Sequence, residues 1–432
     1  MAYQLRDYQQ RAVDFAVPRL KQSAKPLLMS IGTGAGKTWI ISEMAKRWGE
    51  KVLVLTVSKE LCLQDYEKLK IVNEGESIGL YSASWKQKSV EKITVATVQS
   101  ACKHPELWED YSLLILDECD CFPLDGCVSE LISKKRVCGL TATSYATTGS
   151  RQGDWFTTKI YPIHKIKSKT HGWFWKPVEF QLSEKDLLEM GYLCPMKIYS
   201  SPINCGRLRL QSNGGEYTAE SISAWALEIL ERIVQVMEGA EKNNMCRSGL
   251  VFMPSVESCL QLEALCKAKG LSVGSVTYKT NSKVRDGLVE SHRKGEIKWL
   301  ISQGCLARGF DSPATDCLIL ARPTKSLRLH RQILGRGLRM AEGKKVCYVF
   351  DLTENCKTWG GPEDVEIGKN EKKHDTILLR GKDISGMEVS VINVADMANR
   401  KKEIIIAGEE KDNGKGRKND VFGCGWSRTK SI

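Results

Sequence analysis

Residues 30–38 read SIGTGAGKT, and this glycine-rich stretch decides the fold. The apolar run Leu27–Met29 precedes it and Trp39–Trp48 has helical patterning, so we expect a strand, a tight turn and a helix. In such a turn the backbone N–H groups point at phosphate oxygens, and the helix dipole adds to the attraction. We expect Lys37 to reach the β- and γ-phosphates of a nucleotide and the Thr38 hydroxyl to bind Mg²⁺.

This predicted phosphate loop departs at one position from the usual G-x-x-x-x-G-K-[ST] spacing. Ile31 stands where the first glycine is expected. A chance glycine turn is the alternative, but the strand before it and the helix after it argue against chance. The residues expected to contact ATP here are Gly32, Thr33, Gly34, Ala35, Gly36, Lys37 and Thr38.

An acidic turn follows another apolar run. Leu113–Leu116 leads directly into Asp117-Glu118-Cys119-Asp120. Ligands of α/β sheets bind outside the carboxyl ends of the strands, so we expect these acids to lie beside the phosphate loop. Asp117 is then expected to hold Mg²⁺, directly or through water, and Glu118 to position or deprotonate the attacking water. ATP and Mg²⁺ are therefore the expected cofactors.

Short apolar runs alternate with helical stretches along most of the chain. This pattern predicts an α/β fold with two parallel-sheet domains in tandem, at residues 1–170 and 205–355, joined by a connector at 171–204. Residues 356–432 are expected to form a small, partly flexible C-terminal extension in which Thr376–Leu379 and Glu403–Ala407 are candidate strands. The runs are Val52–Val57, Ile93–Val98, Leu113–Asp117, Val137–Thr141, Leu250–Met253, Val273–Thr277, Trp299–Ser302, Leu318–Ala321 and Val346–Asp351.

Composition narrows the class of protein. The chain has 432 residues and a net charge of +12, which favours a polyanionic partner, most simply a nucleic acid. Its 16 cysteines form no C-x-x-C pair, so we expect no metal other than Mg²⁺. The N-terminus lacks the apolar core of a signal peptide, and no apolar run approaches the ~20 residues that span a bilayer. We expect a cytoplasmic protein with reduced thiols and no membrane partner.

One stretch combines aromatic residues with lysines. Trp155–Val178 contains no acid but has five lysines and several aromatic rings. Such a mixture suits single-stranded nucleic acid, because bases stack on rings while phosphates lie near cations. The alternative is an interdomain segment whose rings pack on the domains.

The motifs, taken in order from Leu5 to Asp351, resemble those of superfamily 2 helicases. The resemblance implies that both domains are RecA-like. Within the superfamily the chain is most similar to the RadD-like branch, which is related to the XPB-type helicases and includes phage-encoded proteins of similar length. Unlike RadD-like proteins, it has only Cys424 beyond Cys356, so their C-terminal zinc module is absent or replaced. The motif segments are Leu5–Gln9, Leu55–Gln64, Val95–Ser100, Thr141–Thr143, Gly191–Leu193, Leu250–Pro254, Gly304–Asp311, Arg322–Thr324 and Gln332–Arg339.

The resemblance assigns roles at both ends of the predicted ATP site. Gln9 would read the adenine edge, with Arg6 nearby. Gln332, Arg336 and Arg339 are spaced i, i+4 and i+7, which places them on one face if the segment is helical. Presented across the cleft, they would stabilise charge on the γ-phosphate, and an arginine used in this way is worth about 10³–10⁵ in rate. A solvated basic helix is the alternative.

A nucleic-acid track is expected to cross both domains. Its contacts would go mostly to phosphate and sugar, which carry no sequence information. Hydroxyls at strand ends are also often local caps, and that alternative stays open. For Arg322, Lys325 and Arg328 we expect either a surface or a phosphate-contact role. The predicted nucleic-acid contacts are Ser58, Thr97, Gln99, Thr141 and Gly309.

These observations predict an ATP-dependent DNA helicase or translocase. It would couple ATP hydrolysis to movement along single-stranded or branched DNA during repair, recombination or replication, in the cytoplasm of a bacterium or of a phage-infected host. The resemblance implies movement in the 3′→5′ direction. The alternatives are an RNA-directed ATPase with the same core, an ATP-gated nucleic-acid clamp and, least compatible with a second α/β domain, a P-loop metabolic kinase.

Overall fold

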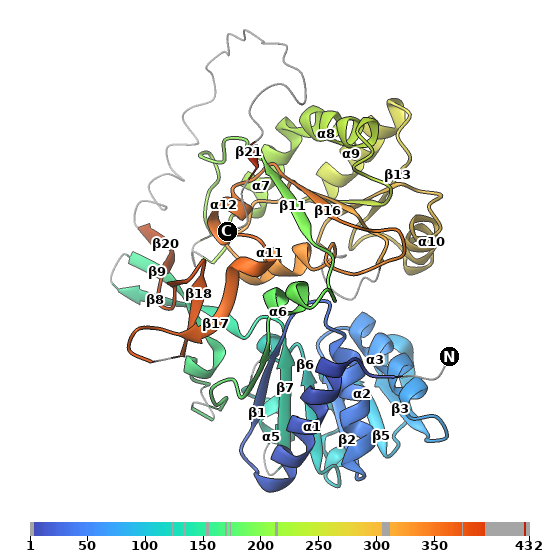
Figure 1. Ribbon diagram of the computed structural model, residues 1–432, viewed down its shortest axis with the longest axis vertical. Coiled ribbons are helices and arrows are strands. Elements are labelled where there is room, and N and C mark those ends of the chain that lie inside the picture. Colours follow the sequence, from blue (N-terminus) through green and yellow to red (C-terminus); the bar gives the residue numbers. More distant parts are fainter. Residues whose placement is uncertain are drawn as a thin grey trace.

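The computed structural model describes residues 4–393, apart from short gaps at 123, 133–134, 153–154, 169–170, 173, 212–214, 305–311 and 374, and it also describes Ser427–Arg428. Two α/β units lie one above the other, with the N-terminal unit at the bottom of Figure 1. The predicted tandem α/β architecture is confirmed. Within the described residues, none of the helices combines the length and apolar character needed to cross a bilayer.

The first unit is built on an eight-stranded sheet with the order β10-β1-β7-β6-β2-β5-β3-β4. All neighbours pair in parallel except the short β4. The strands are β1 (Leu27–Ile31), β2 (Val52–Thr56), β3 (Ile78–Ser82), β4 (Gln87–Lys88), β5 (Ile93–Thr97), β6 (Leu113–Asp117), β7 (Arg136–Thr141) and β10 (Phe180–Leu182).

Both faces of this sheet are covered. Leu27, Met29 and Ile31 of β1 belong to one apolar cluster, whereas Leu28 belongs to another, because successive side chains of a strand point to opposite faces. The first cluster contains helices α1 (Asp7–Gln22), α2 (Lys37–Trp48) and α3 (Lys59–Val72), and the second contains α4 (Val98–Ala101) and α5 (Cys127–Ile132). This two-sided burial explains why the strands are largely apolar on both of their faces.

The second unit has a seven-stranded sheet with the order β13-β14-β12-β15-β16-β11-β21. Its strands are β11 (Met196–Ser200), β12 (Gly249–Phe252), β13 (Val273–Val276), β14 (Trp299–Ser302), β15 (Cys317–Leu320), β16 (Cys347–Asp351) and the antiparallel β21 (Ser427–Arg428). Its helices are α7 (Ala219–Glu228), α8 (Leu230–Lys242), α9 (Val256–Ala268), α10 (Ser282–Arg293), α11 (Leu327–Leu334) and α12 (Asn355–Trp359).

The stretch 171–204, expected to be a connector, contributes to both sheets. Phe180–Leu182 forms β10 beside β1, and Met196–Ser200 forms β11 beside β16. Strand β10 covers what would otherwise be the exposed edge of β1, and an uncovered edge invites pairing with other chains. Between these strands lies the short helix α6 (Glu184–Glu189), which Figure 1 places between the two units.

The C-terminal extension folds back onto both units. It forms a sheet of β17 (Val365–Lys369), β18 (Asp375–Leu379) and β19 (Lys382–Asp383), while β20 (Glu388–Asn393) pairs with β9 of the hairpin β8 (Tyr145–Gln152) and β9 (Trp155–Pro162). The expected strand Thr376–Leu379 is present as β18, and Glu403–Ala407 lies outside the described residues.

An apolar cluster holds this extension in place. Tyr145 and Ile160 come from the hairpin, Leu327 comes from α11, and Val365 and Ile377 come from the extension itself. All five side chains are nearly or fully buried. Because burial of apolar surface is the main favourable term in folding, this cluster joins three parts of the chain into one packed body.

The aromatic stretch before β10 packs in part on the first unit. Trp175 is 4% exposed, and a Cβ atom added at Gly139 would come within 2.4 Å of its ring. Phe174 contacts the same ring at 5.0 Å between centroids. These two rings therefore follow the packing alternative, whereas Trp173 lies outside the described residues.

Candidate active site

A cleft of about 580 Å³ lies between the two units and brings together most of the predicted ATP-site residues. The first unit contributes the phosphate loop, the acidic turn and the start of α1, and the second contributes Pro313 and residues beyond α11. The described residues that line it include Arg6, Gln9, Thr33, Gly34, Ala35, Gly36, Lys37, Thr38, Asp117, Glu118, Tyr192, Pro313, Arg336 and Arg339.

The phosphate loop owes its shape to its glycines. Gly34 and Gly36 have φ values of +85° and +74°, in the left-handed region that favours glycine. Space is also restricted, because a Cβ atom at Gly36 would lie 2.7 Å from the Gln9 amide nitrogen. The turn then delivers Lys37 and Thr38 at the start of α2, as the sequence predicted.

Lys37 and Glu118 face each other in the cleft. The Lys37 Nζ atom lies 3.1 Å from Glu118 Oε1, and their side chains are 11% and 19% exposed. Burial alone would lower the pKa of Lys37, but the charges of Glu118 and Asp117 outweigh it and raise that pKa. Glu118 has a φ of +53°, which is strained for a residue with a side chain and is typical of functional sites.

Asp117 is suited to hold a cation. It is 2% exposed, and within the described residues its Oδ1 atom has no hydrogen-bond partner. Burial, together with the charge of Glu118, raises the pKa of Asp117 to about 7 despite the opposing charge of Lys37. A divalent cation would satisfy this oxygen and favour the ionised carboxylate, so Asp117 fits the predicted Mg²⁺ site, and Thr38 lines the same cleft.

The expected adenine-reading residues lie at one end of the cleft. The Gln9 amide donates to the Ala35 carbonyl at 2.9 Å, and its Oε1 accepts from the Arg6 N–H at 3.0 Å. Tyr192 also lines the cleft, although the sequence predicts it only as part of a family motif and not of the ATP site. Its ring lies under the Arg6 guanidinium at 5.1 Å and beside the Tyr8 ring at 4.8 Å, where it can contact a flat base.

The second unit approaches the phosphate loop very closely. A Cβ atom at Gly335 would overlap the Thr33 side chain, at 2.1 Å from its Cγ2 atom. Only a glycine therefore permits this contact. Arg336, which is 8% exposed, and Arg339 line the cleft just beyond it.

The prediction that Gln332, Arg336 and Arg339 lie on one face of a helix is wrong. Helix α11 ends at Leu334, and the following N–H groups of Arg336 and Gly337 bond to carbonyls only three residues earlier. Gln332 is buried in the helix, where its carbonyl accepts from Arg336 Nε at 3.4 Å, and it is not among the residues that line the cleft. The two glycines at 335 and 337 explain this early end, since glycine is a poor helix former.

A buried lysine that the sequence did not single out supports Arg336–Arg339, which we call the arginine segment. Lys344 is 4% exposed, and its Nζ donates to the carbonyls of Arg339 at 2.7 Å, Gly337 at 2.8 Å and Pro313 at 3.2 Å. Burial lowers the pKa of Lys344. The three hydrogen bonds fix two segments that line the cleft.

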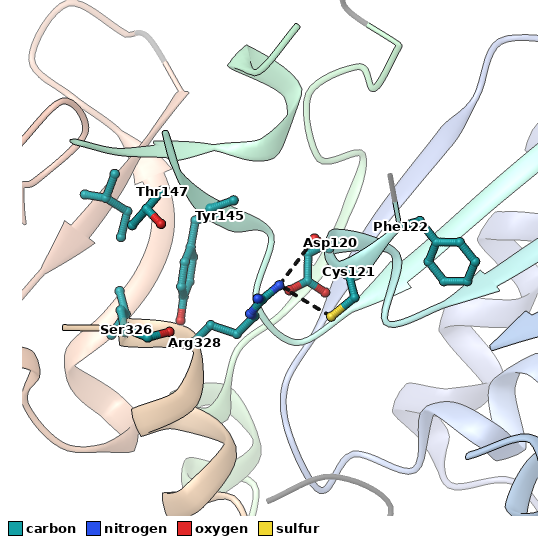
Figure 2. A pocket seen from close by; sticks show the side chains of 10 residues that line it. Asp120, Cys121, Phe122, Tyr145, Thr147, Ser326 and Arg328 are labelled. Atoms are coloured by element: carbon teal, nitrogen blue, oxygen red, sulfur yellow. Dashed lines mark hydrogen bonds and ion pairs between the residues drawn. The ribbon is translucent and has the colours of Figure 1, made fainter. Parts of the chain in front are cut away.

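A second interdomain pocket, of about 390 Å³, lies beside the acidic turn (Figure 2). The Asp120 carboxylate accepts hydrogen bonds from the hydroxyls of Thr141 at 2.7 Å and Thr143 at 2.9 Å. Arg328 of α11 pairs with the same carboxylate at 3.3 Å and reaches the Cys121 sulfur at 3.4 Å. Arg328 thus links the second unit to the acidic turn.

The predicted nucleic-acid contacts are only partly available on the surface. Ser58 caps α3, accepting from the Leu61 N–H at 3.2 Å, and the Thr97 hydroxyl donates to Ser100 at 2.9 Å. Thr141 is fully buried and serves the acidic turn, whereas Gln99 is exposed. Gly309 lies outside the described residues. These hydroxyls make the local hydrogen bonds that the alternative expects, and the nucleic-acid contacts stay predictions.

Comparisons with known families agree with this geometry. The family described as "Type III restriction enzyme, res subunit" matches residues 2–145, and the family described as "Helicase conserved C-terminal domain" matches residues 226–341. The first match covers the phosphate loop and the acidic turn, and the second covers the arginine segment.

Two relatives and one solved structure extend these matches. IRC3 of Saccharomyces cerevisiae, named as a candidate ATP-dependent helicase, is 26% identical over 81% of this chain, which spans 51% of that protein. The DNA 3'-5' translocase XPB2 of Sulfurisphaera tokodaii is 23% identical over 78% of this chain and 79% of that protein. A fragment of a candidate HsdR subunit of a type I restriction enzyme from Vibrio vulnificus has the same fold, with a TM-score of 0.59 and 18% identity over 87% of this chain and 71% of that chain.

Proposed function

We propose that this chain, which belongs to superfamily 2 of the ATP-dependent helicases, is a DNA translocase or helicase driven by ATP hydrolysis. The observation that carries the proposal is the two-sided cleft, in which the phosphate loop and the acidic turn face Arg336 and Arg339 of the second unit. ATP bound there would contact both units through its γ-phosphate. Hydrolysis would remove those contacts, so the two units would separate and close once per cycle.

The chain's own residues supply the chemistry of this cycle. The Lys37 ammonium, now paired with Glu118, would move to the β- and γ-phosphates, which leaves the Glu118 carboxylate free to position the attacking water. Arg336 and Arg339 would stabilise the charge that develops on the γ-phosphate oxygens. Bound Mg²⁺, held by Asp117 and Thr38, would neutralise charge between the phosphates.

DNA is the polymer we propose, in single-stranded or branched form. The named activity of XPB2 supports a DNA substrate, 3′→5′ movement and the proposed XPB-related branch. Because the chain spans only 51% of IRC3 and 63% of a second relative, the substrate and any role in repair, recombination or replication are part of the proposal. An RNA-directed ATPase and an ATP-gated clamp remain the alternatives.

We also propose that the protein works in a cytoplasm, bacterial or that of a phage-infected host. The cysteines of the part of the chain that the structure describes form no disulfide with one another, and most are buried. Reducing compartments keep cysteines in this state.

The test is ATP turnover with single-stranded, duplex and forked DNA and with RNA of matched sequence. We expect stimulation by DNA that weakens steeply with salt, because phosphate contacts release counterions. Greater stimulation by RNA would favour the RNA-directed alternative. If neither DNA nor RNA stimulates ATP turnover, the translocase is excluded. If a nucleic acid stimulates turnover but the protein does not displace another protein bound to that strand, the ATP-gated clamp is favoured.

The variant Glu118→Gln separates binding from hydrolysis. It should bind ATP but lose roughly a hundredfold or more in turnover. Glu109→Gln, an exposed acid of the same unit, is the matched control and should behave as the unaltered protein does. Normal turnover in Glu118→Gln would contradict the proposed role of that carboxylate.

A further inference from the structure

A buried ion pair joins the phosphate loop to the second unit, away from the open cleft. Glu184, in the first turn of α6, accepts the Thr33 N–H on its Oε1 atom at 3.0 Å. Its other oxygen pairs with the Arg331 guanidinium of α11. Both side chains are only 4% exposed. One carboxylate therefore contacts the loop that binds phosphate and the helix that leads to the arginine segment.

The same arginine also contacts the C-terminal extension. Arg331 Nη1 donates to the carbonyls of Pro362 at 3.0 Å and Val365 at 3.2 Å. The space beside the pair measures about 20 Å³, room for no more than about one water molecule. Little solvent can therefore reach the pair, and the position of α11 depends mainly on Glu184.

Thr33 is held from two sides. Glu184 binds its backbone N–H, while its Cγ2 atom lies against Gly335, the residue directly after α11 and before Arg336. A shift of α11 relative to Glu184 would therefore move Gly335 against Thr33 and displace the arginine that follows. The phosphate loop is thus connected to Arg336 through the contacts of Glu184 and Gly335 with Thr33.

We infer that Glu184 is a positioning residue for ATP hydrolysis, which holds α11 against the phosphate loop so that Arg336 and Arg339 reach the γ-phosphate. This inference rests on the proposed function. Glu184 does not line the cleft, but we expect ATP hydrolysis to require it. Displacement of a reacting group by about 1 Å can cost about 10²-fold in rate, so loss of this support should appear in turnover. ADP has no γ-phosphate, and its binding should change little.

The test compares Glu184→Gln with the unaltered protein in DNA-stimulated turnover and in binding of fluorescent ADP. The amide oxygen can still accept the Thr33 N–H, but the charge that holds Arg331 is lost. We expect kcat to fall at least tenfold, while KM for ATP and the affinity for ADP stay within threefold. The matched control is Glu179→Gln, which breaks the more exposed Arg19–Glu179 pair within the first unit and should leave kcat unchanged.

Glu184 could instead serve only to keep the protein folded. The amount of folded protein separates this role from a role in positioning the arginines. The folded fraction is measured by ADP binding, and kcat is expressed per ADP site. Unchanged kcat per site in Glu184→Gln would overturn the inference, as would equal losses in kcat and in ADP affinity. If Glu184→Gln does not fold, Arg331→Lys serves in its place, because it keeps a cation beside Glu184 but not the planar contact. Full kcat per site in Arg331→Lys would also overturn the inference.

Failure of the proposed function would look different. If the unaltered protein shows no nucleic-acid-stimulated turnover, the translocase proposal fails before any variant is compared. If it does, and Glu184→Gln matches it, only the positioning role fails.

Discussion

Two ion pairs lie beside the phosphate loop, and they differ in whether a ligand can replace one of the partners. Lys37–Glu118 lies within the first unit and opens onto a cleft of about 580 Å³, whereas Glu184–Arg331 crosses between the units beside about 20 Å³ of space. A nucleotide can replace Glu118 as the partner of Lys37, but the space beside Glu184 is too small to admit a nucleotide. We interpret the first pair as an exchangeable contact and the second as a fixed one.

The largest expected effect tests the fixed pair. Arg331→Met should lower the free energy of unfolding by about 3–5 kcal/mol, because it leaves the Glu184 carboxylate buried and unpaired. Urea unfolding followed by tryptophan fluorescence measures this. Glu184→Met/Arg331→Met removes both charges and should recover part of the loss. A single variant as stable as the unaltered protein would show that the pair is not fixed in solution.

The exchangeable pair should matter for turnover and little for stability. Lys37→Ala should reduce ATP turnover by roughly a hundredfold or more, because the lysine is expected to neutralise charge on the transferred phosphoryl group. The midpoint of urea unfolding should change by much less than in Arg331→Met. Lys46→Ala, on the same helix α2 but exposed, is the control. A large loss of stability in Lys37→Ala would remove the distinction between the two pairs.

Substitution of Lys344 should have an intermediate effect on turnover, because its ammonium group binds the backbone carbonyls of the arginine segment. Lys344→Met should reduce kcat by about tenfold, equivalent to about 1.4 kcal/mol in the barrier, by freeing the Gly337 and Arg339 carbonyls. Steady-state kinetics with saturating DNA measure it. Lys345→Met, the exposed neighbour, should have no effect. Equal kinetics in the two variants would show that Arg339 needs no such support.

The smallest expected effect is a pH dependence of the fixed side. His330, next to Arg331, is 1% exposed and donates from Nε2 to the Gly360 carbonyl at 2.9 Å. Burial lowers the pKa of His330 to about 4. The unfolded chain therefore binds the proton first as pH falls below about 6.5, so stability is lost from there down to about pH 4.

Between pH 6 and pH 5 this loss should be about 1 kcal/mol for one histidine. Urea unfolding at both values measures it, and His330→Gln should show a correspondingly smaller dependence. Because His292 is also buried with a lowered pKa, only the difference between the protein and its variant reports on His330. Identical pH dependence in both would mean that His330 is not buried in its neutral form.

The exchangeable side was predictable from sequence, and the fixed side was not. The phosphate loop and the acidic turn are contiguous motifs whose spacing follows from strand, turn and helix, so Lys37 and Asp117 could be placed before the structure was known. Glu184 lies about 150 residues from both Thr33 and Arg331 in the sequence. Local patterns hold no information on such pairs, and Arg331 resembles any other cation of a basic helix.

The motif Gln332–Arg339 could be predicted only in part from the sequence. The i, i+4, i+7 spacing would place Gln332, Arg336 and Arg339 on one face of a helix, yet α11 ends at Leu334. Two glycines follow that end, and the first of them, Gly335, lies against Thr33. Lys344 was equally hidden, since three carbonyl partners cannot be recognised from a lysine in a polar loop.

The pairing of β20 with β9 has a consequence for biosynthesis. Glu388 pairs with Lys159 across more than half of the chain, so β9 leaves the ribosome long before its partner exists. At about 5–20 residues per second, the edge of β9 waits on the order of 10–50 s before β20 can cover it. During translation the nascent first unit therefore carries an open strand edge, and a chain truncated before residue 388 would keep it permanently.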